Sequence, residues 1–257
     1  MTFDFETIID RRGKDAVAVD APAVQMSGGF FPETKVQEEF SIIPMWVADM
    51  NFQTAPAVAQ AIRSRADHHL YGYFLPPSQY FQSIINWQKE RNGVTDLKPE
   101  HIGYENGVLG GVVSALRILC SNGDPVLVQT PTYVGFTHSL EDNGWKSVLN
   151  PLKRNAEGIW RMDYEDMERK IIENHVHAAI FCSPHNPSGR VWQAWEIEKA
   201  MEIFARHDVY VIADEIWSDL TLPGYHHIPT QSVSEDARNR TIALYSPSKA
   251  FNLAGLV

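Results

Sequence analysis

The chain has 257 residues, 44% of them hydrophobic, and a formal net charge of −10. This length suffices for one large or two small domains, and an acidic balance without a basic cluster argues against nucleic acid or an anionic membrane as a partner. The apolar runs are too short to span a bilayer and no signal peptide precedes the first acidic residues, so we expect a cytoplasmic protein. Cys120 and Cys182 show no metal-binding or C-x-x-C spacing, which predicts two buried thiols and no metal site.

The pattern of apolar residues predicts an irregular arm followed by alternating strands and helices. Residues 1–45 are of mixed character and predict an arm with a short helix near residues 6–11. Helices are expected at 56–67, with Thr54 as the candidate N-cap, and at 77–91. Beyond residue 100 the alternation indicates a mainly parallel sheet with helices on both faces. The expected strands are 101–105, 126–129, 147–149, 178–182, 210–213 and 242–245, and the expected helices are 109–119, 134–143, 163–174 and 195–207.

Three of the expected strands end in residues that can carry chemistry. The first leads into Asn186-Pro187-Ser188-Gly189, the second into Asp214-Glu215, and the third into Ser246-Pro247-Ser248-Lys249. The carboxyl ends of parallel strands form the edge of a sheet at which ligands bind. A lysine after a buried strand suits Schiff-base chemistry, which needs a neutral amine. Taken alone, however, each of these segments is better interpreted as a turn or a solvated strand end.

The combination Asn-Pro-x-Gly, Asp-Glu-Ile and Ser-x-x-Lys, in this order, resembles the pyridoxal-phosphate enzymes of the aspartate-aminotransferase fold. The opening segment 3–13 and the segment 46–52, which reads W-V-A-D-M-N-F, are similar to the MalY/PatB group of cystathionine β-lyases. The resemblance extends from residue 3 to the last residue. It implies an α/β, fold-type-I, transferase-like architecture with an N-terminal arm over 1–45 and a cofactor-binding large domain over 46–257. Family members continue for roughly another domain, so we expect the C-terminal small domain to be absent and the chain to be a fragment.

The resemblance also implies a role for each candidate site residue toward pyridoxal 5′-phosphate. Lys249 would hold the cofactor and act as general base, while Asp214 would keep the pyridine nitrogen protonated. Asn186 would donate to the 3-oxygen, and Tyr133 would stack on the ring. The phosphate would be bound by the N–H groups of Val108 and Leu109 and by Ser246 and Ser248. Tyr73, with Tyr71 as a competitor, would reach the phosphate of a neighbouring subunit, which implies a homodimer with the active site at the subunit interface.

Two departures from the usual aminotransferase pattern favour the lyase group. Trp217 stands where aminotransferases carry a tyrosine, and Val257 stands where they often carry an arginine. The resemblance therefore implies a carbon–sulfur β-lyase that converts the amino acid cystathionine, or a related cysteine S-conjugate, to pyruvate, ammonia and a thiol. An aminotransferase and a non-catalytic binding or regulatory protein remain alternatives. A metal site at His226-His227 is disfavoured, because adjacent imidazoles diverge; the lyase group has a G-x-x-H-x-P loop here.

Overall fold

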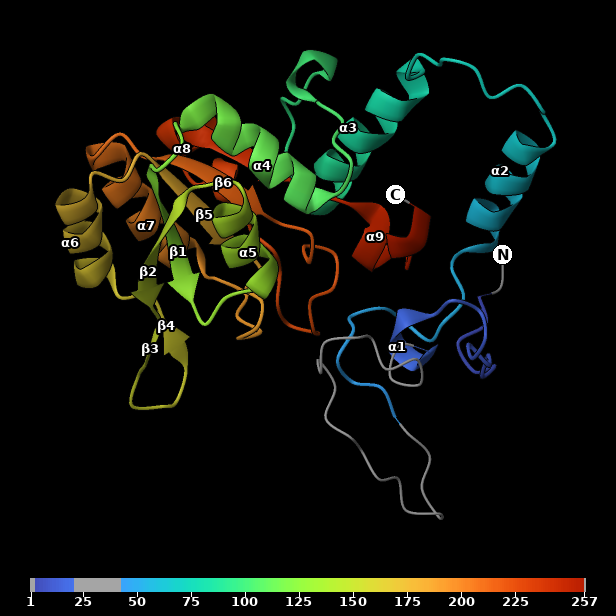
Figure 1. Cartoon of the computed structure of the whole chain (residues 1–257), viewed down its shortest axis with the longest axis horizontal. Coiled ribbons are helices and arrows are strands. Elements are labelled where there is room, and N and C mark those ends of the chain that lie inside the picture. The colour runs from blue at the N-terminus through green and yellow to red at the C-terminus, as the bar shows by residue number, and fades with distance from the viewer. Residues whose placement is uncertain (1–2, 21–42, 257) are drawn as a thin grey trace. The chain divides into compact units, whose positions relative to one another are not determined.

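The structure is a computed structural model that describes residues 3–20 and 43–256. It divides into two compact units, one formed by Met1–Gly72 with Pro247–Leu256 and the other by Tyr73–Ser246 (Figure 1). The boundary expected near residue 45 stays a prediction. Within the described ranges, no helix combines the length and apolar character needed to cross a membrane.

The first unit contains short helices joined by turns. Its elements are α1 (Val17–Asp20), α2 (Pro56–Ala66), α9 (Pro247–Ala250) and the 3-10 turn η3 (Ala254–Leu256). The short helix expected near residues 6–11 is wrong, since the segment is irregular. The carboxylates of Asp4 and Asp10 accept hydrogen bonds from backbone N–H groups two and three residues further on. Such local bonds offer the backbone an alternative to the helix.

The N-terminus of α2 also differs from expectation. Its N-cap is Ala55, without a side-chain bond, and Pro56 occupies the first helical position, where a missing N–H costs nothing. The capping role expected for Thr54 is therefore wrong. Its hydroxyl instead donates to the carbonyl oxygen of Phe251 at 2.8 Å.

The second unit is built on a five-stranded sheet with the order β2-β1-β5-β6-β7, in which every neighbouring pair is parallel. The strands are β1 (Pro125–Thr130), β2 (Lys146–Pro151), β5 (Ala178–Cys182), β6 (Tyr210–Asp214) and β7 (Thr241–Leu244). They confirm five of the six expected strands. Because β5 pairs Cys182 with Asp214, and β6 pairs Asp214 with Leu244, the ends of these three strands lie in one row.

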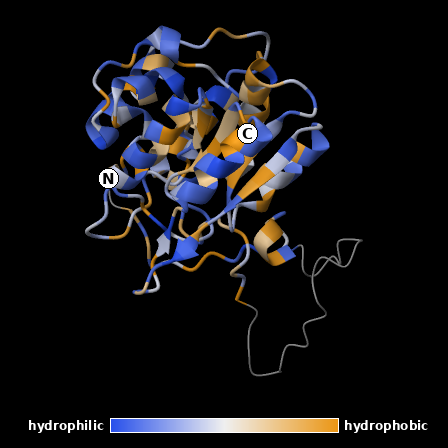
Figure 2. Cartoon of the chain, turned by 90° about the vertical axis from the view of Figure 1, so that its left-hand side faces the viewer, coloured by the Kyte–Doolittle hydropathy of each residue, from blue (hydrophilic) through white to orange (hydrophobic). Residues whose placement is uncertain are grey.

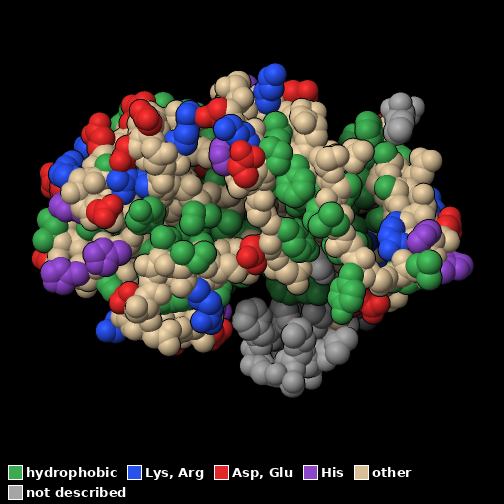
Figure 3. Space-filling view, turned by 90° about the horizontal axis from the view of Figure 1, so that it is seen from above, with side chains coloured by type: hydrophobic (Ala, Val, Ile, Leu, Met, Phe, Trp, Pro, Cys, Tyr) green, Lys and Arg blue, Asp and Glu red, His purple; other side chains and the backbone are tan. Residues whose placement is uncertain are grey.

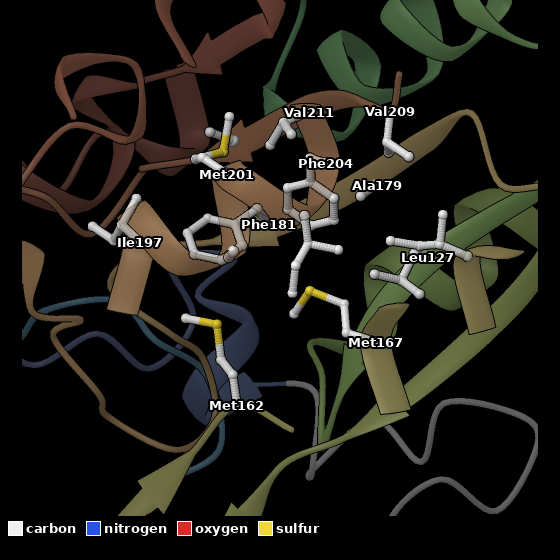
Figure 4. Packing of buried hydrophobic residues seen from close by; sticks show 14 of the residues in the cluster. Leu127, Met162, Met167, Ala179, Phe181, Ile197, Met201, Phe204, Val209 and Val211 are labelled. Atoms are coloured by element: carbon white, nitrogen blue, oxygen red, sulfur yellow. The ribbon is translucent and has the colours of Figure 1, made fainter. Parts of the chain in front are cut away.

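Helices cover both faces of this sheet. On one face, α4 (Val108–Leu119) and α5 (Val134–Asp142) pack over strand residues such as Val128 and Ile180. On the other, α6 (Tyr164–Asn174), α7 (Ala194–Arg206) and α8 (Glu235–Arg240) enclose a cluster around Phe181 and Phe204 (Figure 4). The inner strands of the sheet are mainly hydrophobic, and the helices around them carry many hydrophilic residues (Figure 2). Each large side chain buried in these clusters contributes about 1.5–3 kcal/mol, which makes this sheet a stable support for its carboxyl edge.

The remaining elements of the second unit lie outside the main sheet. They are α3 (Ser78–Asn92), the 3-10 turns η1 (Pro99–His101) and η2 (Thr230–Ser232), and the hairpin of β3 (Lys153–Arg154) and β4 (Trp160–Arg161). The strand expected at 101–105 is wrong. Pro99 starts a turn closed by the bond from Ile102 N–H to the Pro99 carbonyl oxygen, and the next three residues are exposed and have no partner strand. On the face seen in Figure 3, acidic and basic side chains are interspersed.

Candidate active site

The carboxyl edge of the parallel sheet carries most of the candidate residues. Asp214 ends β6, the loop with Asn186 follows β5, and Ser246 follows β7 two residues beyond its end. The register places Asp214 between the ends of the other two strands. The sheet therefore brings together three residues that are separated in the sequence.

Asp214 is a carboxylate at the buried end of a strand. Asp214 is only 5% exposed, and its Oδ1 accepts a hydrogen bond from the N–H of Ile216 at 3.1 Å. A buried carboxylate favours a cationic or N–H partner, because burial without one is costly. The same carboxylate influences its neighbour on β5: burial first, and then the charge of Asp214, raise the pKa of Cys182. That thiol is therefore an inert, protonated part of the core.

Hydrogen bonds of His185 hold the loop that carries Asn186. The backbone of His185 exchanges hydrogen bonds with Gly189 and Arg190, both of 2.8 Å, and its Nδ1 lies 2.8 Å from Ser188 Oγ. Burial lowers the pKa of His185 to about 4, so the imidazole is neutral at physiological pH. The half-buried Asn186 is thus fixed on a tight turn, with its N–H toward Cys182 Sγ at 3.4 Å.

Helix α4 begins at the same edge of the sheet. Its N-cap, Gly107, has φ +79°, a conformation that favours glycine. The helix packs against β7 so closely that a Cβ added at Gly111 would lie 3.0 Å from Leu244 Cδ2. The N–H groups of Val108 and Leu109 lie in the first turn, where no intrahelical acceptor exists. The arrangement offers a ready anion site beside the ends of the strands.

Tyr133 lies next to this helix because Gly135 has no side chain to obstruct its ring. A Cβ at Gly135 would lie 2.4 Å from Tyr133 Cε1 and 2.9 Å from Leu109 Cδ1, so both side chains occupy the space that a larger residue would need. The Tyr133 ring also packs edge-on against Phe136 with centroids 5.5 Å apart. It is 39% exposed and can therefore present one face to a ligand.

Ser248 and Lys249 lie in the other unit, on the single turn of α9. Lys249 Nζ donates to the carbonyl oxygen of Ala48 at 3.0 Å. Asn252 follows the turn with φ +56°, and its side chain bonds the backbone of Met50 and Phe52 with three contacts of 3.1 Å. The segment 46–52, which reads W-V-A-D-M-N-F, thus fixes the lysine-bearing turn.

Three further positions complete the comparison with the sequence. Tyr73 is fully exposed, and its expected role toward a neighbouring subunit stays a prediction. Val257 lies outside the described residues. Of the histidine pair, His227 donates through Nε2 to Glu215 Oε2 at 2.8 Å. Among the residues that the structure describes, no group of three His, Cys, Asp or Glu side chains is arranged to hold a metal ion.

Sequence reasoning missed the buried residues behind the edge. Glu215 is fully buried and binds His227 and Tyr245, and Gly135 makes room for Tyr133. The signal that could have identified Glu215 is its place directly after Asp214, because binding of the ligand needs only one of these two carboxylates. Gly135 gave no signal, because its neighbours depend on the packing of two helices.

Comparisons with known proteins agree with this arrangement. Residues 42–256 match the profile of a family described as aminotransferase class I and II. The chain is 39% identical over 214 residues to the cystathionine beta-lyase PatB of Bacillus subtilis, an alignment covering 83% of this chain and 55% of that protein. It is 29% identical over 255 residues to protein MalY of Escherichia coli, covering 99% and 61%.

Solved structures give the same result. The pyridoxal-phosphate-bound C-S lyase from Staphylococcus hominis matches with a TM-score of 0.87 and 33% identity, covering 100% of this chain and 62% of that one. Cystalysin from Treponema denticola, whose crystal structure contains a pyridoxal 5′-phosphate cofactor, matches with a TM-score of 0.89 and 32% identity, covering 100% and 62%. The chain thus spans between 55% and 62% of the length of these relatives.

Proposed function

Because the chain belongs to the aminotransferase class I and II family and has its fold-type-I architecture, we propose that the whole protein is a pyridoxal-phosphate-dependent carbon–sulfur β-lyase. Cystathionine or a related cysteine S-conjugate is the substrate, and pyruvate, ammonia and a thiol are the products. The observation that carries the proposal is the likeness to lyases in both sequence and structure. An aminotransferase on the same site is the alternative that the test below must separate.

The residues at the carboxyl edge fit this cofactor. The buried carboxylate of Asp214 suits a protonated pyridine nitrogen, and the fixed turn of Asn186 suits the neighbouring ring oxygen. The exposed face of Tyr133 suits a flat ring, while the first turn of α4 and the hydroxyl of Ser246 suit a phosphate. By the family resemblance, Ser248 would add a second hydroxyl, and the Lys249 amine would hold the cofactor through its aldehyde. When bound, pyridoxal phosphate supplies an electron sink for charge at the substrate α-carbon.

The chain's own residues then perform proton transfer and orientation. The Lys249 amine would accept the α-proton of the substrate as general base, which requires its neutral form. Asp214 would hold the proton of the cofactor's pyridine nitrogen. Tyr133 and Asn186 would orient the cofactor, and with it the substrate bonds that break in the elimination. The thiolate leaves from Cβ, and water completes the release of pyruvate and ammonia.

A steady-state assay tests the proposal. With L-cystathionine and no keto acid, the full-length protein should release pyruvate and a thiol over many turnovers. An aminotransferase would stop after one half-reaction and resume on addition of 2-oxoglutarate, since its cycle needs a second substrate. That pattern would replace the lyase by the aminotransferase, and protein that binds no pyridoxal phosphate would refute both.

We further propose that the protein is a homodimer, with Tyr73 reaching the partner's site. The run from Leu70 to Leu75 supports this, because Leu70, Phe74 and Leu75 are each more than 70% exposed. A contiguous apolar run of this kind marks an interaction site, and a second copy is the occupant that would place Tyr73 at a phosphate. Sedimentation should show a dimer, and Phe74→Ser with Leu75→Ser should give a monomer. A monomeric wild type would refute the proposal.

We also propose a cytoplasmic location. Cys120 and Cys182 are both free thiols, as expected in a reducing compartment. Fractionation of cells that express the full-length protein should recover it with cytoplasmic markers, and recovery with exported proteins would contradict the proposal.

A further inference from the structure

A buried carboxylate lies directly behind the candidate active site. Glu215 is 0% exposed and accepts three hydrogen bonds, two from the loop that carries His227 and Thr230 and one from Tyr245. Oε1 accepts from the N–H of Thr230 at 2.7 Å, and Oε2 accepts from His227 Nε2 at 2.8 Å and from the Tyr245 hydroxyl. Both carboxylate oxygens are therefore used, and two segments of the chain converge on one side chain.

The donors in this network follow from its geometry. Burial, and then the charge of Glu215, raise the pKa of Tyr245 well above its usual value, so the phenol remains a hydrogen-bond donor. The His227 side chain is 2% exposed, and its Nδ1 has no hydrogen-bond partner among the residues described. Nε2 is therefore the ring nitrogen that donates, since an N–H at Nδ1 would be an unpaired buried donor. The network is thus a fixed set of donors around one acceptor group.

The network joins the two strands that carry Asp214 and Ser246. Asp214 pairs with Leu244 at the end of the sheet, and the N–H of Glu215 donates to the Leu244 carbonyl oxygen at 3.0 Å. The next residue after each of the two strands is Glu215 or Tyr245, and the Tyr245 hydroxyl donates to Glu215 Oε2. Side chains alternate in direction along extended backbone, so this link clamps the chain immediately beside the two residues that face the ligand.

We propose that Glu215 is a positioning residue for the phosphate end of the cofactor, acting through the Tyr245 hydroxyl on Ser246. His227 and Thr230 hold the carboxylate in place by occupying its remaining lone pairs. The proposal rests on the proposed function, in which Ser246 binds the phosphate of pyridoxal phosphate. It assigns to the second carboxylate of Asp214-Glu215 a role that the reaction itself does not require.

The test separates positioning of Ser246 from a general structural role. Tyr245→Phe removes only the hydroxyl that binds Glu215, and its effect is measured as the dissociation constants of pyridoxal phosphate and of pyridoxal, which lacks the phosphate. Tyr164→Phe is the matched control, because it removes a phenol bond of 3.2 Å to the Glu196 carbonyl oxygen on α7, away from this edge. Apo-protein unfolding is recorded for each variant.

We expect Tyr245→Phe to weaken pyridoxal phosphate about tenfold, because a displaced Ser246 would lose its hydrogen bond to the charged phosphate, and to leave pyridoxal within about twofold. Ser246→Ala should show the same selectivity, and the double variant should bind pyridoxal phosphate no more weakly than Ser246→Ala alone. An equal loss for both ligands, additive losses, or the same selectivity in Tyr164→Phe would overturn the proposal.

Two further results keep the test decisive. Should Tyr245→Phe fail to fold, Glu215→Gln replaces it; its amide oxygen still accepts from Thr230, while its NH2 group takes the place of Oε2 and offers the Tyr245 hydroxyl no acceptor, so the loss should be comparable and show the same phosphate selectivity. Equal loss of both ligands in Glu215→Gln would count against the proposal. A wild-type protein that binds no pyridoxal phosphate would refute the proposed function and this inference with it, whereas unselective variants of a wild type that binds it would refute the inference alone.

Discussion

Gly135→Ala is expected to weaken cofactor binding while leaving the fold intact. The added Cβ would lie 2.4 Å from Tyr133 Cε1, 2.8 Å from Tyr133 Cζ and 2.9 Å from Leu109 Cδ1. Because carbon atoms pack at about 3.5–4 Å, the Tyr133 ring must move by about 1 Å. The ring is 39% exposed and can swing outward, so the strain stays near the lower end of overpacking, about 1 kcal/mol. The gain of about 1 kcal/mol from alanine in a helix offsets it.

The displaced ring can no longer stack on the cofactor in its native position. Loss of a stacking contact of about 0.5–1.5 kcal/mol, together with the shift of Leu109, predicts a dissociation constant for pyridoxal phosphate raised about tenfold. Absorbance titration measures it, and urea unfolding of the apo-protein checks the fold. Gly103→Ala is the control, since a Cβ there meets nothing within 4 Å. The reasoning fails if Gly135→Ala binds like wild type, or if its loss persists undiminished in a Tyr133→Ala background.

Three other outcomes are expected. Borohydride reduction of the full-length protein with pyridoxal phosphate should fix the label to Lys249, and recovery on another lysine by mass spectrometry would disprove the assignment. Asn252→Gly allows the φ of +56° but removes three side-chain hydrogen bonds, so it should lower the free energy of unfolding by about 1–3 kcal/mol and slow cofactor incorporation. Asn252→Ala should cost about 1 kcal/mol more, because alanine disfavours a positive φ. A glycine variant that matches wild type in both measurements would refute this. His185 has a pKa of about 4 in the fold against 6.5 unfolded, so only the unfolded chain binds its proton between these values. The contribution of His185 to the free energy of unfolding should therefore fall by about 3 kcal/mol from pH 7 to pH 4. Urea unfolding should show this as a difference between wild type and His185→Gln that shrinks over this range, and a constant difference would contradict it.

The sheet and its edge were predictable because their signals are local. Apolar runs of four or five residues identified the buried parallel strands, and the polar residues that end them, such as Asn186 and Asp214, follow directly in the sequence. The expected strand at 101–105 is wrong, because the segment is exposed and pairs with no strand, so its apolar residues do not indicate a buried strand. The helix near residues 6–11 failed because the Asp10 side chain takes the N–H of Arg12, which a helix would pair with the carbonyl oxygen of Ile8.

The residues that support the site were not predictable, and the reason is physical. A ligand restricts the chemistry of the groups it touches, so Asp214 and Lys249 have residue types that a reader of the sequence can interpret. A supporting residue is restricted only by where its partners lie in space. Glu215 meets Thr230 and His227 across a loop and Tyr245 across a strand pair, at separations of 15, 12 and 30 residues. Such distances follow from the register of β6 and β7 and from the path of the loop, neither of which a motif encodes. Substitutions behind the edge should therefore alter how tightly the phosphate is held while the residues that touch the ligand stay unchanged.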